Sequence, residues 1–426
     1  MRVLLVAENR EKKPTPAIPL GLCYVAEAVR KAGHEVKLVD LMFADGFERH
    51  IAEAIEGFGP EAIGISLRNL DDMDSVEPVF YPPMAKRVID FIKSLSDAPI
   101  VAGGYAVSIA PEEMLRYLDV EIGVVGEGEI AFTKVLEQVG KSRELAAIPG
   151  VALLEDGELA YRKPELIPDL NELPAPALDL IDYPRYLAEG TEACVQTKRG
   201  CPFSCTYCPV PIFQGAARRL REPTAVADEM EGLVQGFGAE KFYIGDNIFN
   251  FPLEHAVAIS EEIIRRRLKM SWTSYFHPGF LDKESAHAFK MSGCSLVIFN
   301  TGAILANERG TDLDALEEAS EICAGQELPF AHYLVFGEPG HSLKMLKEVC
   351  SIMEKVRPAG FYIIPAVRVY PGSRLARIAE ERGCGLGSLF EPTFYPHPEG
   401  DEIAEYAKKM CREHKRWYYS MKIPSA

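Results

Sequence analysis

Two regions of the chain alternate short apolar runs, typical of buried strands, with segments of helical periodicity. In residues 1–140 the helical pattern is clearest at 20–33, where apolar residues recur on one face and Gly33 supplies a stop. Strands that alternate with helices predict a parallel sheet covered on both faces. Five such strands suit a flavodoxin-like, Rossmann-like domain, whose ligand binds at the carboxyl ends of the strands. The strand-like runs lie at 2–7, 35–40, 62–67, 99–104 and 121–126.

The second region predicts a partial barrel. Residues 141–192 include a proline-rich stretch with little periodicity, so we expect a linker there. Residues 193–375 then hold six strand-like runs separated by helical patterns, and six β/α units are too few to close a TIM barrel. Residues 376–426 are charged and helical in pattern, which predicts a short helical extension. The six runs lie at 193–198, 241–246, 270–275, 295–300, 330–337 and 360–369.

Composition narrows the possible partners. The chain has 426 residues, 47% of them hydrophobic, which is ample for two buried cores. Its formal net charge of −17 argues against a nucleic-acid partner. No apolar run is long enough to cross a bilayer, and the opening residues turn polar at Glu8, so we expect no membrane partner and a cytoplasmic location.

Three cysteines form the strongest chemical motif. Cys201, Cys205 and Cys208 are spaced C-x3-C-x2-C just after the strand predicted at 193–198. A structural zinc site needs four ligands, and no further cysteine or histidine follows until His255. A [4Fe–4S] cluster held by three thiolates keeps one iron open to bind a substrate or cofactor. An iron–sulfur cluster is therefore favoured over buried free thiols or an incomplete zinc site.

The stretch RGCPFSCTYC resembles the signature of the radical S-adenosylmethionine (SAM) superfamily, whose members hold a [4Fe–4S] cluster in a partial β/α barrel. The resemblance implies that the open iron chelates SAM and that SAM is cleaved to a 5′-deoxyadenosyl radical. FYIGDNIFN stands where the superfamily binds the methionine ammonium of SAM, although Asp246 and Asn247 also suit a helix N-cap. Asn300 occupies the place of a ribose-binding acidic residue. The implied SAM-binding residues are Tyr207, Asp246, Asn247 and Asn300.

A Rossmann-like domain before such a barrel resembles the cobalamin-dependent subclass. The first domain has no D-x-H-x-x-G motif, so we expect no histidine below the cobalt. Arg68 is a candidate neighbour of that lower face, and a surface ion pair with Asp71 or Asp72 is an equal alternative. Glycines after the strands would let the backbone approach a bulky ligand. The implied cobalamin-binding residues are Arg68, Gly103, Gly104, Tyr105, Gly126, Glu127 and Gly128.

The resemblance implies a C-methyltransferase that uses the 5′-deoxyadenosyl radical and methylcobalamin on an unactivated sp3 carbon. Methylthiotransferases share the domain order, but their first domain carries three cysteines, whereas this one has only Cys23. Two alternatives are a cyclase or rearrangement enzyme without net methyl transfer, and a non-catalytic cobalamin or cluster sensor.

The substrate is less constrained by the sequence. A small molecule, a peptide or a protein is compatible with it, and glutamine of methyl-coenzyme M reductase is one example from the family. Flavodoxin or ferredoxin is the expected electron donor. Candidates for the substrate cavity are Tyr275, His277, His332 and Tyr333. Core residues that alternate along a strand would show the same pattern.

Overall fold

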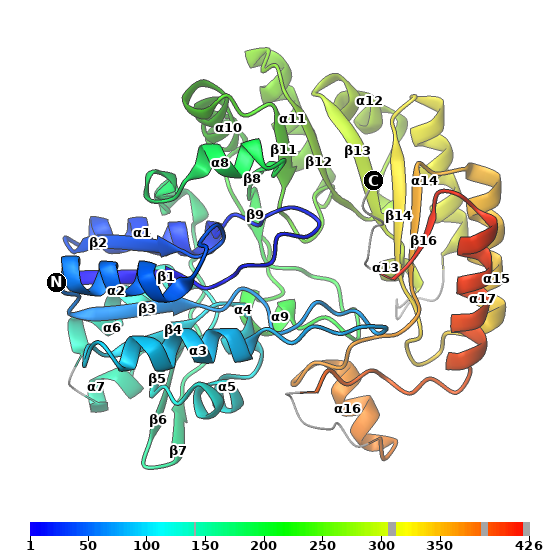
Figure 1. Ribbon diagram of the computed structural model, residues 1–426. Coiled ribbons are helices and arrows are strands. Elements are labelled where there is room, and N and C mark those ends of the chain that lie inside the picture. Colours follow the sequence, from blue (N-terminus) through cyan, green and yellow to red (C-terminus); the bar gives the residue numbers. More distant parts are fainter. Residues whose placement is uncertain (140–141, 306–311, 385–390, 421–426) are drawn as a thin grey trace. The chain divides into compact units, whose positions relative to one another are not determined.

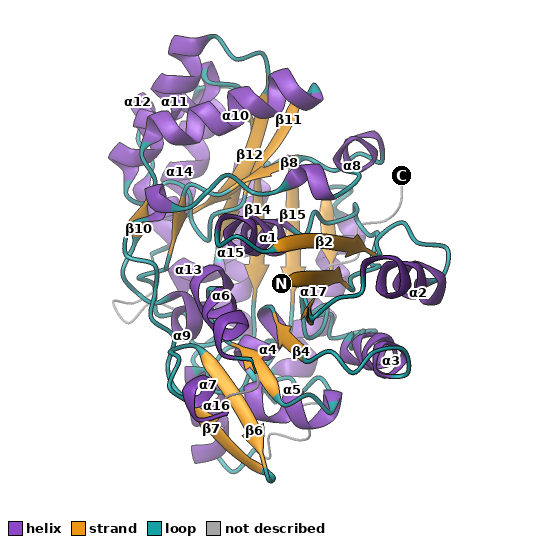
Figure 2. Cartoon of the chain, turned by 90° about the vertical axis from the view of Figure 1, so that its left-hand side faces the viewer, coloured by secondary structure: helices purple, strands orange, loops and turns teal. Residues whose placement is uncertain are grey.

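The computed structural model describes residues 1–139, 142–305, 312–384 and 391–420. These residues form two compact units, each with its own seven-stranded sheet (Figures 1 and 2). The first unit comprises Met1–Asp72, Phe80–Thr191 and Ile212–Gly215. The second comprises Met73–Val79, Glu192–Pro211 and the residues from Ala216 onward. No helix among the described residues combines the length and the apolar character needed to cross a membrane.

The first unit is built on seven strands. They are β1 (Arg2–Ala7), β2 (Glu35–Asp40), β3 (Ala62–Ser66), β4 (Ile100–Gly103), β5 (Ile122–Val124), β6 (Val151–Glu155) and β7 (Glu158–Tyr161). Its helices are α1 (Leu20–Lys31), α2 (Phe47–Phe58), α3 (Pro82–Lys93), α4 (Tyr105–Ile109), α5 (Pro111–Leu118), α6 (Gly128–Gln138), α7 (Ser142–Ala146) and α8 (Tyr183–Ala188), with 3-10 turns at Leu170–Glu172 and Leu178–Leu180. The sheet order is β2-β1-β3-β4-β5-β6-β7. Because β1 to β5 pair in parallel, the predicted flavodoxin-like order is confirmed, with its reversal between β1 and β3.

The second unit has a seven-stranded parallel sheet in the order β16-β15-β14-β13-β12-β11-β8. Its strands are β8 (Ala193–Val195), β11 (Lys241–Ile244), β12 (Ser271–Phe276), β13 (Cys294–Asn300), β14 (Phe330–Val335), β15 (Gly360–Ile364) and β16 (Trp417–Tyr419), beside a small ladder of β9 (Lys198–Arg199) and β10 (Arg219–Leu220). The helices are α9 (Val210–Gln214), which begins here, α10 (Pro223–Phe237), α11 (Leu253–Arg266), α12 (Lys283–Met291), α13 (Gly302–Leu305), α14 (Leu313–Gly325), α15 (Leu343–Val356), α16 (Arg374–Glu381) and α17 (Gly400–Glu413), with a 3-10 turn at Pro278–Phe280. The end strands β8 and β16 do not pair with each other, so the sheet is open, as expected for a partial barrel.

Side chains of the second sheet separate by alternation. In β12, buried residues alternate with half-buried ones, which places Trp272 and Phe276 on one face. Both rings contact Phe289 of α12, with centroids 6.0 and 5.4 Å apart. This face is the hydrophobic core beneath the helices, and each such aromatic side chain stabilises the fold by about 1.5–3 kcal/mol through burial. The half-buried residues therefore point to the opposite face.

Two sequence predictions of domain organisation differ from the structure. The expected linker contains β6 and β7, which extend the first sheet as an antiparallel hairpin. Its turn is Asp156-Gly157, and both residues have positive φ, as a two-residue type I′ hairpin requires. The expected helical extension contains α17, but also β16, which pairs in parallel with β15 as a seventh strand of the second sheet.

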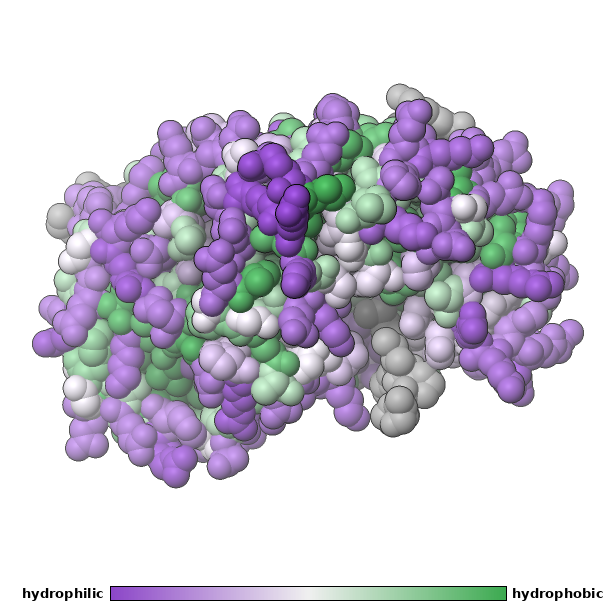
Figure 3. All heavy atoms as spheres, turned by 90° about the horizontal axis from the view of Figure 1, so that it is seen from above, coloured by the Kyte–Doolittle hydropathy of each residue, from purple (hydrophilic) through white to green (hydrophobic). Residues whose placement is uncertain are grey.

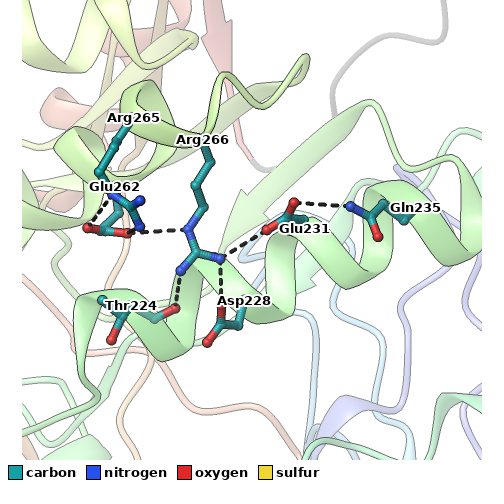
Figure 4. Close-up of polar contacts among 7 residues, drawn as sticks. All are labelled: Thr224, Asp228, Glu231, Gln235, Glu262, Arg265 and Arg266. Carbon is teal, nitrogen blue, oxygen red and sulfur yellow. Dashed lines mark hydrogen bonds and ion pairs between the residues drawn. The ribbon is translucent and has the colours of Figure 1, made fainter.

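Charged residues shape the outside of the units. Polar side chains dominate the face seen in Figure 3, in keeping with the net charge of −17. A more ordered group joins α10 to α11, where Arg266 lies between three carboxylates (Figure 4). Its Nη1 contacts Asp228 at 2.5 Å and Glu231 at 3.1 Å, and its Nε contacts Glu262 at 3.3 Å. These contacts fix two neighbouring helices on one side of the sheet.

Candidate functional site

The three predicted cluster ligands lie on one loop of the second unit. The loop runs from the end of β9 to the start of α9 without helix or strand, and all three cysteines are partly exposed. Gly200, which begins it, has φ +89°, a conformation that favours glycine. Ordering a loop of this kind costs about 1–2 kcal/mol per residue in backbone entropy, so contacts elsewhere in the unit must hold it.

An aromatic group supports the first half of the loop. Phe203, between Cys201 and Cys205, stacks on His277 with ring centroids 4.8 Å apart and 15° between the planes. Phe251 and Phe280 complete the group, at 5.3 and 6.1 Å from Phe203. Burial lowers the pKa of His277 to about 4, so its ring is neutral and packs as an aromatic. The ring of His277 therefore supports the cysteine loop, and its place in a substrate cavity stays a prediction.

Polar contacts support the second half of the loop. The Thr206 hydroxyl donates a hydrogen bond to Oε2 of Glu338, a residue that is 1% exposed and follows β14. The Thr206 carbonyl accepts from the Leu375 N–H at 2.8 Å, and the Ser204 carbonyl accepts from Arg374 at 3.1 Å. Burial raises the pKa of Glu338 to about 7, opposed by its bonds from Thr206. The backbone on both sides of Cys205 is thus fixed by distant segments.

The environment of the thiols fits a site for bound metal. Burial raises the pKa of all three, to about 12 for Cys208, while backbone N–H groups of Phe203 and Val210 point at the sulfurs of Cys201 and Cys208. The positive charge of bound irons would stabilise the thiolates that burial alone disfavours. Among the described residues, no three His, Cys, Asp or Glu side chains already converge on one point. The cluster assignment therefore rests on spacing and on the place of the loop.

Asp246 has a different setting from the one expected. Its carboxylate accepts from the Thr197 N–H at 2.8 Å and from the Thr197 hydroxyl, and it lies 3.7 Å from the Lys198 ammonium. The side chain of Asp246 is 0% exposed and that of Lys198 is 3% exposed. Lys198 also donates to the carbonyls of Phe249 and Phe251, at 2.5 and 3.3 Å. The carboxylate thus ties the end of β8 to the loop after β11, so the prediction that it receives the SAM ammonium gains no support from this geometry.

The face of the sheet opposite the helices is rich in tyrosine. We call Tyr243, Tyr275, Tyr333, Tyr362 and Tyr418 the tyrosine face; all five are half-buried residues of neighbouring strands. Ring centroids of Tyr275 lie 6.5 Å from Tyr243 and 6.0 Å from Tyr333. Tyr333, Tyr362 and Tyr418 stand side by side in the register of β14, β15 and β16. Burial raises the pKa of Tyr243, Tyr275, Tyr333 and Tyr362, so these phenols are neutral.

The residues predicted to line the substrate cavity lie on different faces of the sheet. Tyr275 and Tyr333 belong to the tyrosine face and stay candidates, whereas the prediction for His332 is corrected. His332 is fully buried, its Nδ1 lies 2.9 Å from the Thr301 hydroxyl, and its Nε2 lies 3.1 Å from the hydroxyl of Ser320 on α14. Successive strand residues face opposite sides, so His332 points toward the helices while Tyr333 points away.

The remaining predicted SAM residues lie in the same unit. Tyr207 packs against the buried cluster of Val367, Val369 and Leu375, and its burial there raises its pKa. Asn300 ends β13 beside Tyr333, and its Oδ1 is buried without a hydrogen-bond partner among the described residues. Asn247 directly follows Asp246. Their roles toward SAM stay predictions.

Local contacts explain why glycine stands at several of the predicted cobalamin positions of the first unit. A Cβ at Gly104, where φ is +92°, would lie 2.3 Å from the Leu67 carbonyl oxygen. At Gly126, where φ is +82°, it would lie 3.1 Å from the Phe213 carbonyl oxygen. The close approach to the chain's own backbone is therefore a sufficient reason for glycine at both positions, and their role toward cobalamin stays a prediction. Gly128 packs similarly close to Val25 on α1, whereas Gly103 has room.

Other predicted cobalamin residues have partners within the first unit. Tyr105 makes an edge contact with Phe213 at 4.8 Å, and Glu127 accepts from the Ile167 N–H at 2.8 Å. Arg68 follows β3 and is exposed, and its backbone N–H donates to the buried carboxyl of Glu8, which follows β1. Burial raises the pKa of Glu8 to about 8. Glu8 and Arg68 therefore meet where the strand order reverses, and sequence analysis missed Glu8 because nothing in its spacing marks it.

Comparisons with known proteins agree with this architecture. Residues 11–136 match the B12 binding domain family. An uncharacterized methyltransferase of Pyrococcus horikoshii is 30% identical over 308 residues, which cover 70% of this chain and 65% of that protein. An anaerobic magnesium-protoporphyrin IX monomethyl ester cyclase of Rubrivivax gelatinosus is 26% identical over 287 residues, covering 64% of this chain and 50% of that protein. The chain thus spans less than two thirds of either relative.

A solved structure matches almost the whole chain. It is a radical SAM methyltransferase from Kitasatospora setae, determined with cobalamin and a [4Fe–4S] cluster bound (TM-score 0.79, 24% identity, 89% of this chain and 78% of that one). With tryptophan and a SAM analogue bound, the TM-score is 0.80 at 25% identity, covering 89% and 76% of the two chains. The chain thus contains a region that matches the B12 binding domain family, and its fold is similar to that of a radical SAM methyltransferase.

Proposed function

We propose that this protein is a cobalamin-dependent radical SAM C-methyltransferase that acts on an unactivated sp3 carbon. The observation that carries the proposal is the loop of Cys201, Cys205 and Cys208, which follows β8 of the open parallel sheet and the short strand β9, in a chain that also has a B12-binding domain. When bound, the cluster and SAM would supply a 5′-deoxyadenosyl radical, and cobalamin would supply the methyl group.

The chain's own residues would bind and shield these groups. Three cysteines would hold a [4Fe–4S] cluster and leave one iron for SAM. The residues proposed to bind SAM are those predicted from the sequence: Tyr207, Asp246, Asn247 and Asn300. The first unit would hold cobalamin at the carboxyl ends of its strands, beside Arg68 and Glu8.

The tyrosine face favours a substrate whose reacting part is neutral. Its phenols can donate or accept hydrogen bonds while their rings cover apolar groups. In the described strands β11 to β16, the residues that alternate to this face include one charged side chain, Lys241, at the amino end of β11. The residues that reach this face at the carboxyl ends of the same strands are uncharged. Neutral phenols can hydrogen-bond a neutral amide, and we propose a peptide or protein residue such as glutamine of methyl-coenzyme M reductase.

Product analysis tests this function. The chain is loaded without oxygen with iron, sulfide and hydroxocobalamin, then incubated with SAM, reduced flavodoxin or ferredoxin, and a peptide containing that glutamine. We expect 5′-deoxyadenosine and a peptide heavier by one methylene group. The matched control is the same peptide with asparagine in place of glutamine, which should gain no mass. An unchanged glutamine peptide would contradict the proposed substrate, and absence of 5′-deoxyadenosine with every substrate tried would contradict radical SAM chemistry.

A second candidate is a cyclase or rearrangement enzyme without net methyl transfer. The similarity to the Rubrivivax cyclase supports it. Release of 5′-deoxyadenosine together with a substrate that loses hydrogen, and gains no methylene, would favour this candidate over the first.

A further inference from the structure

We propose that Glu338 is a positioning residue that anchors the arm of the loop bearing Cys205 and Cys208 for a bound iron–sulfur cluster. The inference rests on the proposed function, because it concerns the same three cysteines. Neither sequence analysis nor the comparisons point to this residue.

The contact between Glu338 and Thr206 is specific. Thr206 lies between Cys205 and Cys208, and both its hydroxyl and its backbone N–H donate to the carboxylate of Glu338. The hydroxyl and the backbone N–H of Thr206 thus both bind the buried carboxylate of Glu338. Without Glu338, both would be left unsatisfied at a site where little water reaches them.

Glu338 is itself held rigidly. His341 accepts hydrogen bonds at Nδ1 from the N–H groups of Gly337, at 3.1 Å, and Glu338, at 3.3 Å. Gly337 has φ +107°, a conformation that L side chains rarely adopt, so the turn suits glycine. The guanidinium of Arg374 attracts the carboxylate from a third segment. The loop after β14 is therefore a fixed support, and the cysteine loop rests on it.

This support matters because the cysteine arm has little structure of its own. Within the arm, the Cys208 N–H donates to the Cys205 carbonyl at 3.2 Å, a single turn. The Leu375 N–H binds the Thr206 carbonyl, so Thr206 is gripped from two sides. Groups that orient metal ligands typically change metal affinity about 10- to 100-fold when they are removed. Glu338 acts in this way, as an acceptor that fixes the backbone between two ligands.

The test compares three variants with the wild type after anaerobic loading with iron and sulfide. Glu338→Leu removes the acceptor, and Glu338→Gln keeps an oxygen that can accept from Thr206. Glu399→Leu is the matched control, because it removes an exposed carboxylate that binds the Leu343 N–H at 2.7 Å. The readouts are iron per chain and the electron paramagnetic resonance (EPR) spectrum of the reduced cluster with and without SAM.

We expect Glu338→Leu to weaken iron binding about 10- to 100-fold and to lose the SAM-dependent change of the EPR spectrum. Glu338→Gln and Glu399→Leu should match the wild type. Wild-type iron content and spectra in Glu338→Leu would overturn the inference, and so would equal loss in Glu338→Gln, since charge would then matter more than position. If Glu338→Leu does not fold, Thr206→Val decides: altered spectra support the anchor, and unaltered spectra overturn it. A wild type that binds no cluster would instead contradict the proposed function.

Discussion

The buried pair of Lys198 and Asp246 gives the most demanding prediction for stability. Replacing Asp246 by Ala leaves the ammonium of Lys198, which is 3% exposed, without its carboxylate partner. It also removes the acceptor of the Thr197 N–H and hydroxyl. Removing one partner of a buried ion pair typically costs about 3–5 kcal/mol, because an uncompensated charge stays buried. We expect a loss of free energy of unfolding in this range.

Tryptophan fluorescence is the assay, because the chain has two tryptophans and both lie in the second unit. Trp272 in β12 and Trp417 in β16 are buried, so urea titrations followed by their emission report the unfolding of this unit. The second step is a double-mutant cycle with Lys198→Met. Since the methionine has no charge to bury, the double variant should be more stable than the sum of the two losses predicts, by about 0.5–3 kcal/mol.

Two results would refute the reasoning. A loss below about 1 kcal/mol for Asp246→Ala would mean that the carboxylate is not a buried partner of Lys198. Simple additivity in the cycle would mean that the two side chains do not interact. Either result would also favour the prediction that Asp246 binds the SAM ammonium.

Three further predictions concern other parts of the molecule. Arg266→Met should lower the free energy of unfolding by about 1 kcal/mol, and by less at high salt, as measured by urea titration. Arg265→Met should lower it less, because the side chain of Arg265 is 64% exposed and its ion pair is with Glu262. Because burial raises the pKa of Glu8 from 4.5 to about 8, its contribution to stability is present at low pH and is lost as pH rises through this window. Between these two pH values the free energy of unfolding of the wild type should therefore fall, relative to that of Glu8→Gln, by up to about 1.4 kcal/mol per pH unit. Unfolding followed by circular dichroism measures this, and parallel pH profiles of the two proteins would contradict it. His332→Leu should lower the free energy of unfolding by about 1–3 kcal/mol, because two buried hydroxyls lose their imidazole partner. The variant should still bind as much iron as the wild type does. A loss of iron would instead place His332 in the site.

The sequence was most informative where hydrophobic periodicity was strong. The five parallel strands of the first sheet and the strands of the second up to β15 were predicted from their apolar runs, because each has buried residues that pack into a core. The hairpin of β6 and β7 was missed because the proline-rich residues that follow it led to the whole segment being interpreted as a linker, although Asp156-Gly157 is typical of a hairpin turn. Strand β16 was missed because its three residues follow a long charged helix and gain stability only by pairing with β15.

Within the site, spacing alone located the cysteines but not their supports. Thr206 and Glu338 are 132 positions apart, and no local pattern links them. His277 and His332 were chosen because they follow or lie on barrel strands, but the face that a strand residue occupies depends on register. His332 faces the helices and His277 stacks on Phe203, which only the packed structure reveals.

The central claim is that three cysteines hold a cluster with one iron left for SAM. The most direct measurement is the EPR spectrum and iron content of anaerobically loaded protein, for the wild type and for each of Cys201→Ala, Cys205→Ala and Cys208→Ala. We predict about four irons per wild-type chain, a reduced-cluster signal that changes when SAM is added, and loss of both in every variant. Zinc in place of iron, or a cluster signal that SAM leaves unchanged, would contradict the account.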